Sequence, residues 1–296
     1  IYTLSLHDAL PISILSLFIS GAIHDLGHPG FTNNFLINTK NELAIKYNDQ
    51  SVLENYHVSE GFNIIFKKKG CNIFESLSSD DYKICRKRII QCVLATDMTL
   101  HNKEFQFLKS KSQTYNIKGG ENVEKIFENI DPVTSFNLRQ EFLNVLIHSA
   151  DVSNPSKPLE IYKQWAERCV SEFFKQGDME KRLGMPVSFN CDRDTVSLPQ
   201  SQVGFIDAIV YPLFSVICEF FPGVNFTLEN MSKNLAYYKG VKENENKKKI
   251  KEEIKEEDEF DKDEKKESPK SSDDGKDNSV SSNEDESSVS KSKDKE

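Results

Sequence analysis

The sequence has few cysteines, and those it has are scattered. They show no C-x-x-C spacing and no cluster, so neither a disulfide framework nor a cysteine-ligated metal site is predicted. Several lie within apolar helical patterns, where a free cysteine behaves as a small hydrophobic residue. We therefore expect reduced thiols and an intracellular, cytoplasmic protein. The six positions are Cys71, Cys85, Cys92, Cys169, Cys191 and Cys218.

The chain also lacks a surplus of basic residues and a long hydrophobic run near its start. Its 38 Lys and Arg stand against 47 Asp and Glu, and the net charge of −9 argues against nucleic-acid binding by a broad basic face. The apolar run Ile12 to Ile23 is too short to span a bilayer and leads directly into His24 and Asp25, which are costly in lipid. We expect no membrane span, and no secretory signal because residues 1–13 lack a basic start.

Apolar residues recur at helical spacing up to about Gly240 and almost nowhere after it. This pattern predicts an all-α, compact multi-helix domain over residues 14–240. Residues 1–13 show no clear pattern and are expected to be a non-native segment. Residues 241–296 are rich in Lys, Glu, Asp and Ser and cannot bury enough apolar surface to offset their ordering entropy. We expect a disordered acidic tail there, a candidate docking segment for protein partners.

Ala22 to Gly30 has the composition of a metal-binding segment. His24 and Asp25 are adjacent, and His28 follows four residues after His24. On a helix the two histidines would share a face, with Asp25 about 100° away. Imidazole nitrogen and carboxylate oxygen suit a divalent ion, and the carboxylate could bridge to a second one. The same residues could instead form an ordinary polar helix end, and the motif alone does not decide.

A second acidic residue follows a core helix. The apolar stripe within residues 138–146 predicts a helix that runs into His148 and Asp151. A carboxylate there is poorly explained by packing, because a buried acid needs a partner such as a metal ion. We interpret His148 as a hydrogen-bonded core histidine. His101, which follows a helix predicted over residues 83–97, is expected at the surface.

Three further polar residues carry two interpretations each. Glu54 stands third after Ser51, as in a helix-capping box, or it points at metal-bound water. Thr96, at the end of the predicted 83–97 helix, is a capping group or takes part in the site. Gln202 shares a helical face with Phe205, and it either caps the helix start or reads the edge of a heterocycle while Phe205 stacks on the ring.

Two predictions concern helix packing. Arg88, with its neighbours Arg86 and Lys87, is expected opposite the apolar side of the 83–97 helix. Further on, four apolar residues spaced by four predict a buried stripe, on a helix expected to end at residues 176–178. The stripe residues are Ile161, Trp165, Cys169 and Phe173.

Five separated motifs together resemble those of the class I cyclic-nucleotide phosphodiesterases, in the same order and over about residues 14–240. The resemblance implies an all-α catalytic domain that uses two divalent metal ions to hydrolyse 3′,5′-cyclic nucleotides to 5′-monophosphates in cyclic-nucleotide signalling. The motifs are His24-Asp25-x-x-His28-Pro29-Gly30, Leu53-Glu54-Asn55, Leu94-Ala95-Thr96-Asp97-Met98, His148-x-Ala150-Asp151-Val152-Ser153-Asn154-Pro155 and Ser201-Gln202-Val203-Gly204-Phe205-Ile206-Asp207.

The resemblance implies a ligand set for the metals. His24, Asp25 and Asp151 match three of the four protein ligands of a tight site, which would hold zinc. Asp25 would also bridge to a second ion, magnesium or manganese. A hydroxide between the two ions would be the nucleophile, because metal binding lowers the pKa of water from about 15.7 toward about 7. The residues matching those that hold the metal-bound waters are His28, Glu54 and Thr96, of which His28 and Glu54 are expected to support catalysis.

The resemblance also implies a purine pocket and two departures. Gln202 would bind the purine edge, Phe205 would stack on the ring, and Asn154 would line the pocket. The family's leaving-group acid and first metal-binding histidine lie in an upstream H-N-x-x-H-A-x-D segment that this chain lacks, so we expect an N-terminally truncated domain without its general-acid histidine and with reduced turnover. Gly27 stands where many members carry Asp, which removes one carboxylate near the metals.

Two alternatives stay open at the level of sequence. A His-Asp metal phosphohydrolase acting on linear nucleotides would share the His-Asp pair and a later Asp, without the pair formed by Gln202 and Phe205. A non-catalytic cyclic-nucleotide-binding or scaffold fragment would bind without turnover. The choice between cyclic AMP and cyclic GMP is also open, because a glutamine amide can present either orientation to a purine.

Overall fold

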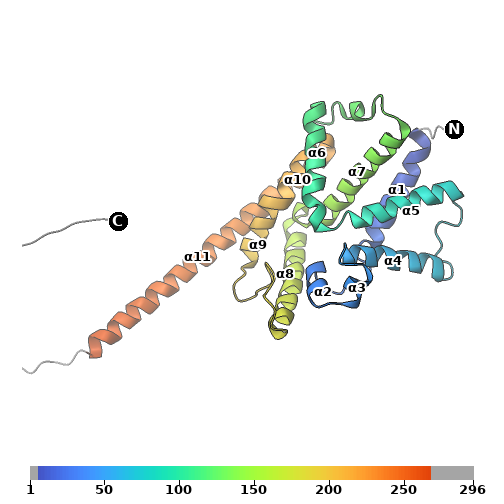
Figure 1. Cartoon of the computed structure of the whole chain (residues 1–296). Coiled ribbons are helices and arrows are strands. Elements are labelled where there is room, and N and C mark those ends of the chain that lie inside the picture. Colours follow the sequence, from blue (N-terminus) through green and yellow to red (C-terminus); the bar gives the residue numbers. More distant parts are fainter. Residues whose placement is uncertain (1–5, 268–296) are drawn as a thin grey trace, which may run out of the picture. The chain divides into compact units, whose positions relative to one another are not determined.

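The structure, a computed structural model, describes residues 6–267, and within them it is helical with no strand (Figure 1). This confirms the all-α prediction. Within these residues the chain divides into two units, one up to Glu245 and one from Asn246 onward. The α-helices are α1 (Leu6–Ile23), α2 (Asn33–Asn38), α3 (Glu42–Lys46), α4 (Val52–Lys67), α5 (Ser79–Leu94), α6 (His101–Tyr115), α7 (Pro132–Asp151), α8 (Leu159–Arg182), α9 (Leu198–Phe205), α10 (Tyr211–Phe220) and α11 (Phe226–Glu267). A π-helical turn, Ile206–Val210, joins α9 to α10.

The first core cluster lies between α1, α4 and α5, and it fixes the end of α1. Ile19, Phe62 and Ile89 are buried in it. Two serines on α1 allow close approach to α5: Ser16 and Ser20 are fully buried, and each hydroxyl bonds back to the carbonyl four residues earlier, at 2.6 and 2.7 Å. Because these contacts hold α1 along its length, the helix delivers the residues that follow Ile23 to a defined place.

The largest core cluster contains the most apolar stretch of the chain. The continuous helical run Leu198–Phe220 is long and apolar enough to cross a membrane by length and composition alone. Its residues Ile206, Val210 and Leu213 are nevertheless 0% exposed and pack with buried residues of α6, α7, α8 and α11. This run therefore behaves as a core helix, and no membrane span is established.

Helix α8 departs from both predictions made for it. The apolar side chains buried along its first half are those of Tyr162, Ala166 and Val170, whereas Ile161 is 46% and Trp165 42% exposed. The predicted buried stripe was therefore wrong by one residue. Spacing by four defines a face, but it cannot decide which of two adjacent apolar faces is covered. The helix also continues through residues 176–178 to Arg182, because Gly177 is packed against the 184–197 loop rather than ending the helix.

Helix α5 carries a buried cation where a surface residue was predicted. Arg88 is 1% exposed, so its predicted place opposite the apolar side was wrong. Its guanidinium stacks 4.2 Å from the centre of the Phe136 ring and donates to Oε1 of Gln140 at 3.3 Å. Burial lowers the pKa of this guanidinium. Both partners lie on α7, which the pattern of α5 alone could not reveal.

Helix α11 crosses the boundary predicted at residue 240 and continues to Glu267. Lys and Glu are strong helix formers, and pairs of opposite charge spaced by four support a helix without a core. Residues 241–267 are therefore helical, where the prediction placed the first part of a disordered tail over residues 241–296. The rest of that tail, like residues 1–5 of the segment 1–13 predicted to be non-native, lies outside the described residues. The division into segments at residues 13 and 240 stays a prediction.

Candidate metal centre

A tight turn links α1 to α2 and carries the first predicted ligands. The amide of Leu26 bonds to the carbonyl of Ile23, and that of His28 to Asp25, both at 3.1 Å. Gly27 sits at φ +75°, in the left-handed region where glycine costs least, and a Cβ there would stand 3.0 Å from the Tyr56 hydroxyl. The turn thus projects three polar side chains from one short segment.

His24, Asp25 and Asp151 come together although Asp151 lies on α7. Nε2 of His24 is 3.4 Å from a carboxylate oxygen of each acid. One ligand atom from each of the three residues lies within 4.8 Å of the others. The side chains are 25%, 63% and 30% exposed, so an ion from solvent can reach them.

The two carboxylates that face Nε2 of His24 favour a positive charge in this cluster. Nδ1 of His24 bonds to the carbonyl of Gly21 at 2.9 Å, so a neutral ring would turn its Nε2 lone pair toward two carboxylates. The hydrogen bond to Asp151 chiefly, against the opposing effect of burial, raises the pKa of His24 to about 9. A proton or a metal ion satisfies the same arrangement. The nitrogen and oxygen donors fit a borderline divalent ion such as zinc.

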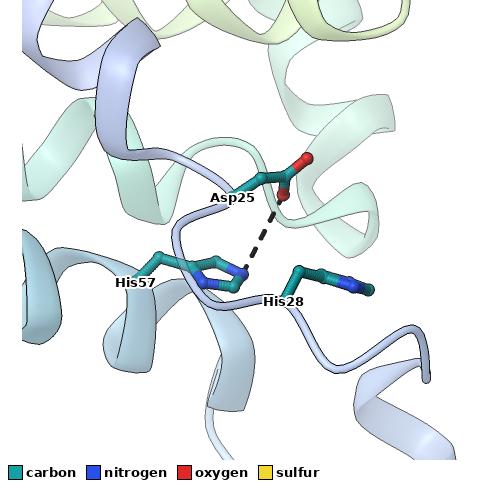
Figure 2. A group of neighbouring side chains, drawn as sticks. All are labelled: Asp25, His28 and His57. Atoms are coloured by element: carbon teal, nitrogen blue, oxygen red, sulfur yellow. Dashed lines mark ion pairs between the residues drawn. The ribbon is translucent and has the colours of Figure 1, made fainter.

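A second group shares Asp25 and adds a histidine that the sequence did not single out (Figure 2). His57 is 2% exposed, and its Nδ1 bonds to the carbonyl of Leu26 at 2.8 Å. Its Nε2 therefore faces Oδ1 of Asp25, 3.9 Å away. Burial lowers the pKa of His57, which favours the neutral, ligating form. The only sequence signal was its spacing of three from Glu54 on the same helix.

His28 completes the second group. Its ring is stacked on that of His57, with 5.6 Å between centroids. Nδ1 of His28 accepts a hydrogen bond from the amide of Gly30 at 3.0 Å, which leaves Nε2 at the outer edge of the ring. An ion beside Asp25 would have both imidazoles within reach of its water ligands.

Glu54 does not cap helix α4. Ser51 makes no side-chain capping bond; its hydroxyl donates instead to Asp97 at 2.7 Å, so the capping-box interpretation was wrong. The Glu54 carboxylate accepts from Nδ2 of Asn33 at 2.9 Å. Burial chiefly, with a smaller contribution from Asp97 and Asp25, raises its pKa. This carboxylate is therefore in the electrostatic field of the metal cluster.

Thr96 lies at the end of α5, 8% exposed, and its hydroxyl donates to the carbonyl of Val93 at 2.8 Å. This is the local helix-end bond of the structural interpretation, and the hydroxyl oxygen keeps its capacity to accept. Asp97, the next residue, caps the following turn through the amide of Thr99. A role for Thr96 toward metal-bound water stays a prediction.

The predicted purine residues lie on α9 and the 3₁₀ turn Asn154–Ser156. Gln202 is 6% exposed and accepts a hydrogen bond from Tyr162 at 2.6 Å; Phe205 is half-buried against the main core, and Asn154 is half-buried. A cavity of 380 Å³ lies between the 187–197 loop and the start of α9, and it is lined by Ser201 but not by Gln202, Phe205 or Asn154. Tyr162 was missed because its partner lies 40 residues away in the sequence.

The two remaining histidines form a buried pair. His148 is 0% exposed and its Nε2 lies 2.9 Å from Nδ1 of His101, which confirms the interpretation of His148 as a hydrogen-bonded core histidine. His101 is 7% exposed, so its predicted surface position was wrong. Burial and the neighbouring His101 lower the pKa of His148 to about 4. The two rings contact each other with centroids 5.2 Å apart, and they join the start of α6 to the end of α7.

The fold and the site together are those of an all-α protein with a metal-binding cluster of histidines and aspartates at the ends of its core helices. The chain belongs to the family described as 3′5′-cyclic nucleotide phosphodiesterase, which it matches over residues 5–231. It is 39% identical over 228 residues to a probable 3′,5′-cyclic-AMP phosphodiesterase, pde-4, of Caenorhabditis elegans and to 3′,5′-cyclic-AMP phosphodiesterase 4C of Rattus norvegicus, each over 77% of this chain. It spans only 32% and 41% of their lengths.

Solved structures give the same assignment. The phosphodiesterase domain of the RhoPDE fusion protein from the choanoflagellate Salpingoeca rosetta superposes with a TM-score of 0.69 at 36% identity, over 80% of this chain and 71% of that one. A second structure of the Salpingoeca rosetta rhodopsin phosphodiesterase domain gives a TM-score of 0.70 at 36% identity, over 82% and 70%.

Proposed function

We propose that this chain hydrolyses 3′,5′-cyclic nucleotides, cyclic AMP foremost, to 5′-monophosphates, as part of cyclic-nucleotide signalling. The observation that carries the proposal is the convergence of His24, Asp25 and Asp151 from two distant segments, in a chain of the phosphodiesterase family. The preference for cyclic AMP is supported by relatives that are named as cyclic-AMP phosphodiesterases.

The proposal includes two divalent ions. Zinc would be held by His24, Asp25 and Asp151, and magnesium or manganese beside Asp25, near His28 and His57. Bound there, such ions would neutralise charge on the phosphate and activate water. The chain's own contribution is orientation, since backbone carbonyls fix the rings of His24 and His57 with Nε2 toward the carboxylates.

The substrate would be read by Gln202, Phe205 and Asn154. The Tyr162 hydroxyl fixes the amide of Gln202, whose oxygen keeps a second lone pair for a purine amino group while its nitrogen donates to a ring nitrogen. Adenine offers that donor–acceptor pair. Phe205 would supply the stacking face. His28, Glu54 and Thr96 would hold metal-bound waters.

The compartment and the partners belong to the same proposal. The six cysteines are free, as expected of a protein in a reducing cytoplasm. Protein partners would bind the acidic segment beyond Glu267, which lies outside the described residues.

A substrate panel with added Zn²⁺ and Mg²⁺ tests the function. We expect hydrolysis of cyclic AMP without hydrolysis of linear nucleotides, and loss of activity in Asp151→Ala. Asp80→Ala, which removes an exposed acid that pairs with Lys83 in the described part of the chain, is the matched control and should be unaffected. Activity retained in Asp151→Ala would overturn the assignment. Turnover of linear nucleotides would favour the general phosphohydrolase, and calorimetric binding of cyclic AMP without turnover would favour the scaffold.

A further inference from the structure

A chain of buried polar groups on α8 connects the loop that follows the proposed metal ligands with the loop that lines the 380 Å³ cavity. We propose that Gln176 and Glu180 are positioning residues that couple the metal loop, residues 28–32, to the cavity loop, residues 187–197. Neither residue contacts the metal cluster or the predicted purine residues. Their effect on turnover rests on the proposed function, whereas the coupling itself can be tested without it.

The first link joins α8 to the metal loop. Oε1 of Gln176 accepts a hydrogen bond from the amide of Thr32 at 2.9 Å, and Gln176 is 1% exposed. Thr32 is the N-cap of α2, so its hydroxyl accepts from the amide of Phe35. One turn earlier on α8, the side chain of Glu172 lies beside Gly30. Helix α8 therefore holds the metal loop at the point where it enters α2.

The second link joins α8 to the cavity loop. Nε2 of Gln176 donates to Oε1 of Glu180 at 2.9 Å. Glu180, also 1% exposed, accepts from the amide of Ser188 at 2.7 Å and from the Ser188 hydroxyl at 2.6 Å. Ser188 lines the 380 Å³ cavity. An unbroken series of hydrogen bonds thus runs from the cavity wall to the metal loop.

Because the hydrogen bonds through Gln176 and Glu180 are buried, they can couple the position of the cavity loop to that of the metal loop. If Ser188 moves away, the Glu180 carboxylate loses two donors in a place that water does not reach, so Glu180 must shift and draw Gln176 with it. The ion pairs of Lys181 to the same loop, with Asp192 and Asp194 at 2.5 and 2.7 Å, are exposed instead. Exposed ion pairs rearrange with little change in free energy, so a shift of the cavity loop is not passed through them to the metal loop.

Amide hydrogen exchange at Thr32 tests the coupling directly. Ser188→Ala removes a hydroxyl at the cavity and should speed exchange of the Thr32 amide by at least about fivefold. Ser188→Thr, which keeps the hydroxyl, should restore the wild-type rate. Lys181→Ala removes exposed contacts to the same loop and should leave the exchange rate of the Thr32 amide within about twofold of the wild-type rate. An unchanged Thr32 rate in Ser188→Ala, or an equal change in Lys181→Ala, would overturn the proposal.

Metal affinity gives a second readout that needs no turnover. Calorimetric titration with Mn²⁺ should show about threefold to tenfold weaker binding in Ser188→Ala. Gln176→Met breaks the series, so adding Ser188→Ala to it should change Mn²⁺ binding no further. Additive effects in the double variant would contradict the relay. If cyclic nucleotides are not hydrolysed but these couplings are found, the proposed function fails and the positioning role stands.

Discussion

The Tyr162 hydroxyl donates a 2.6 Å hydrogen bond to Oε1 of Gln202, and both side chains are buried. Burial raises the pKa of Tyr162, so the hydroxyl stays protonated and remains a donor at every physiological pH. The bond joins α8 to α9 and gives the Gln202 amide a single orientation. The side chain of Gln202, which is predicted to bind the purine edge, is therefore oriented by a buried tyrosine of α8.

Tyr162→Phe should weaken nucleotide binding while the protein stays folded. It removes the donor and leaves the buried amide of Gln202 free to rotate, a loss of about 1 kcal/mol in stability and about fivefold to tenfold in affinity. Competition binding with cyclic AMP and denaturant unfolding measure the two effects. Tyr237→Phe, on the partly exposed ring next to Tyr238, is the control. An unaltered affinity for cyclic AMP would show that the Tyr162 bond does not set the pocket.

His57→Gln should separate the two metal positions. Among the described residues, His57 belongs to the group with Asp25 and His28 and not to the group with His24 and Asp151. Its loss should therefore lower the affinity for the second ion by about tenfold to a hundredfold and leave the affinity of the site at Asp151 unchanged. Titration with Mn²⁺ after zinc loading would report this as one lost site of two. Lys67→Gln, at the exposed end of the same helix α4, is the control. Equal weakening of both sites would mean that His57 supports the cluster as a whole.

The stability of the protein should depend on the protonation of Glu104. This carboxyl group is 1% exposed, and neither of its oxygens has a hydrogen-bond partner among residues 6–267. Burial chiefly, then the charge of Glu141, raises its pKa from 4.5 to about 7. The folded state therefore keeps a proton that the unfolded chain has lost between these values. The contribution of the protonated Glu104 to the free energy of unfolding is therefore complete below pH 4.5 and is lost as the pH rises through about 7.

Glu104→Gln isolates that contribution, because the amide has no charge to lose. The free energy of unfolding of the variant minus that of the wild type should rise by about 2 to 3 kcal/mol between pH 5 and pH 8. Denaturant unfolding at several pH values measures it, with the exposed Glu128→Gln as control. A difference that stays constant with pH would show that Glu104 is ionised in the folded protein throughout.

The part of the site that sequence could predict has a common physical origin. His24 and Asp25 directly follow α1, and Asp151 is the last residue of α7. Polar residues at the end of a core helix can be recognised without knowing what the helix contacts. The same holds for the all-α fold, because helical periodicity is a local property. The structure brings these residues together as the motifs predicted.

The rest depends on partners from other helices. His101 is followed by Asn102, Lys103 and Glu104, a polar run that predicts the surface, yet α7 covers it and supplies His148. Likewise His57 looks like one residue among polar neighbours on α4 until the carbonyl of Leu26 fixes its ring. Burial of a polar side chain is decided by what packs over it, and the spacing of residues within one helix carries no record of that.

Gly177→Ala should be among the most damaging small substitutions in the chain. An ideal Cβ at this position would stand 1.9 Å from the carbonyl oxygen of Cys191, which is backbone and cannot rotate away. The cavity loop would have to move off α8, so we expect a loss of at least about 2 kcal/mol in the free energy of unfolding. Gly240→Ala is the matched control, since nothing lies within 4 Å of its Cβ and alanine favours a helix by about 0.5 to 1 kcal/mol. Thermal and denaturant unfolding of both variants should therefore shift in opposite directions. A Gly177→Ala protein as stable as the wild type would show that the loop does not need this close approach to α8.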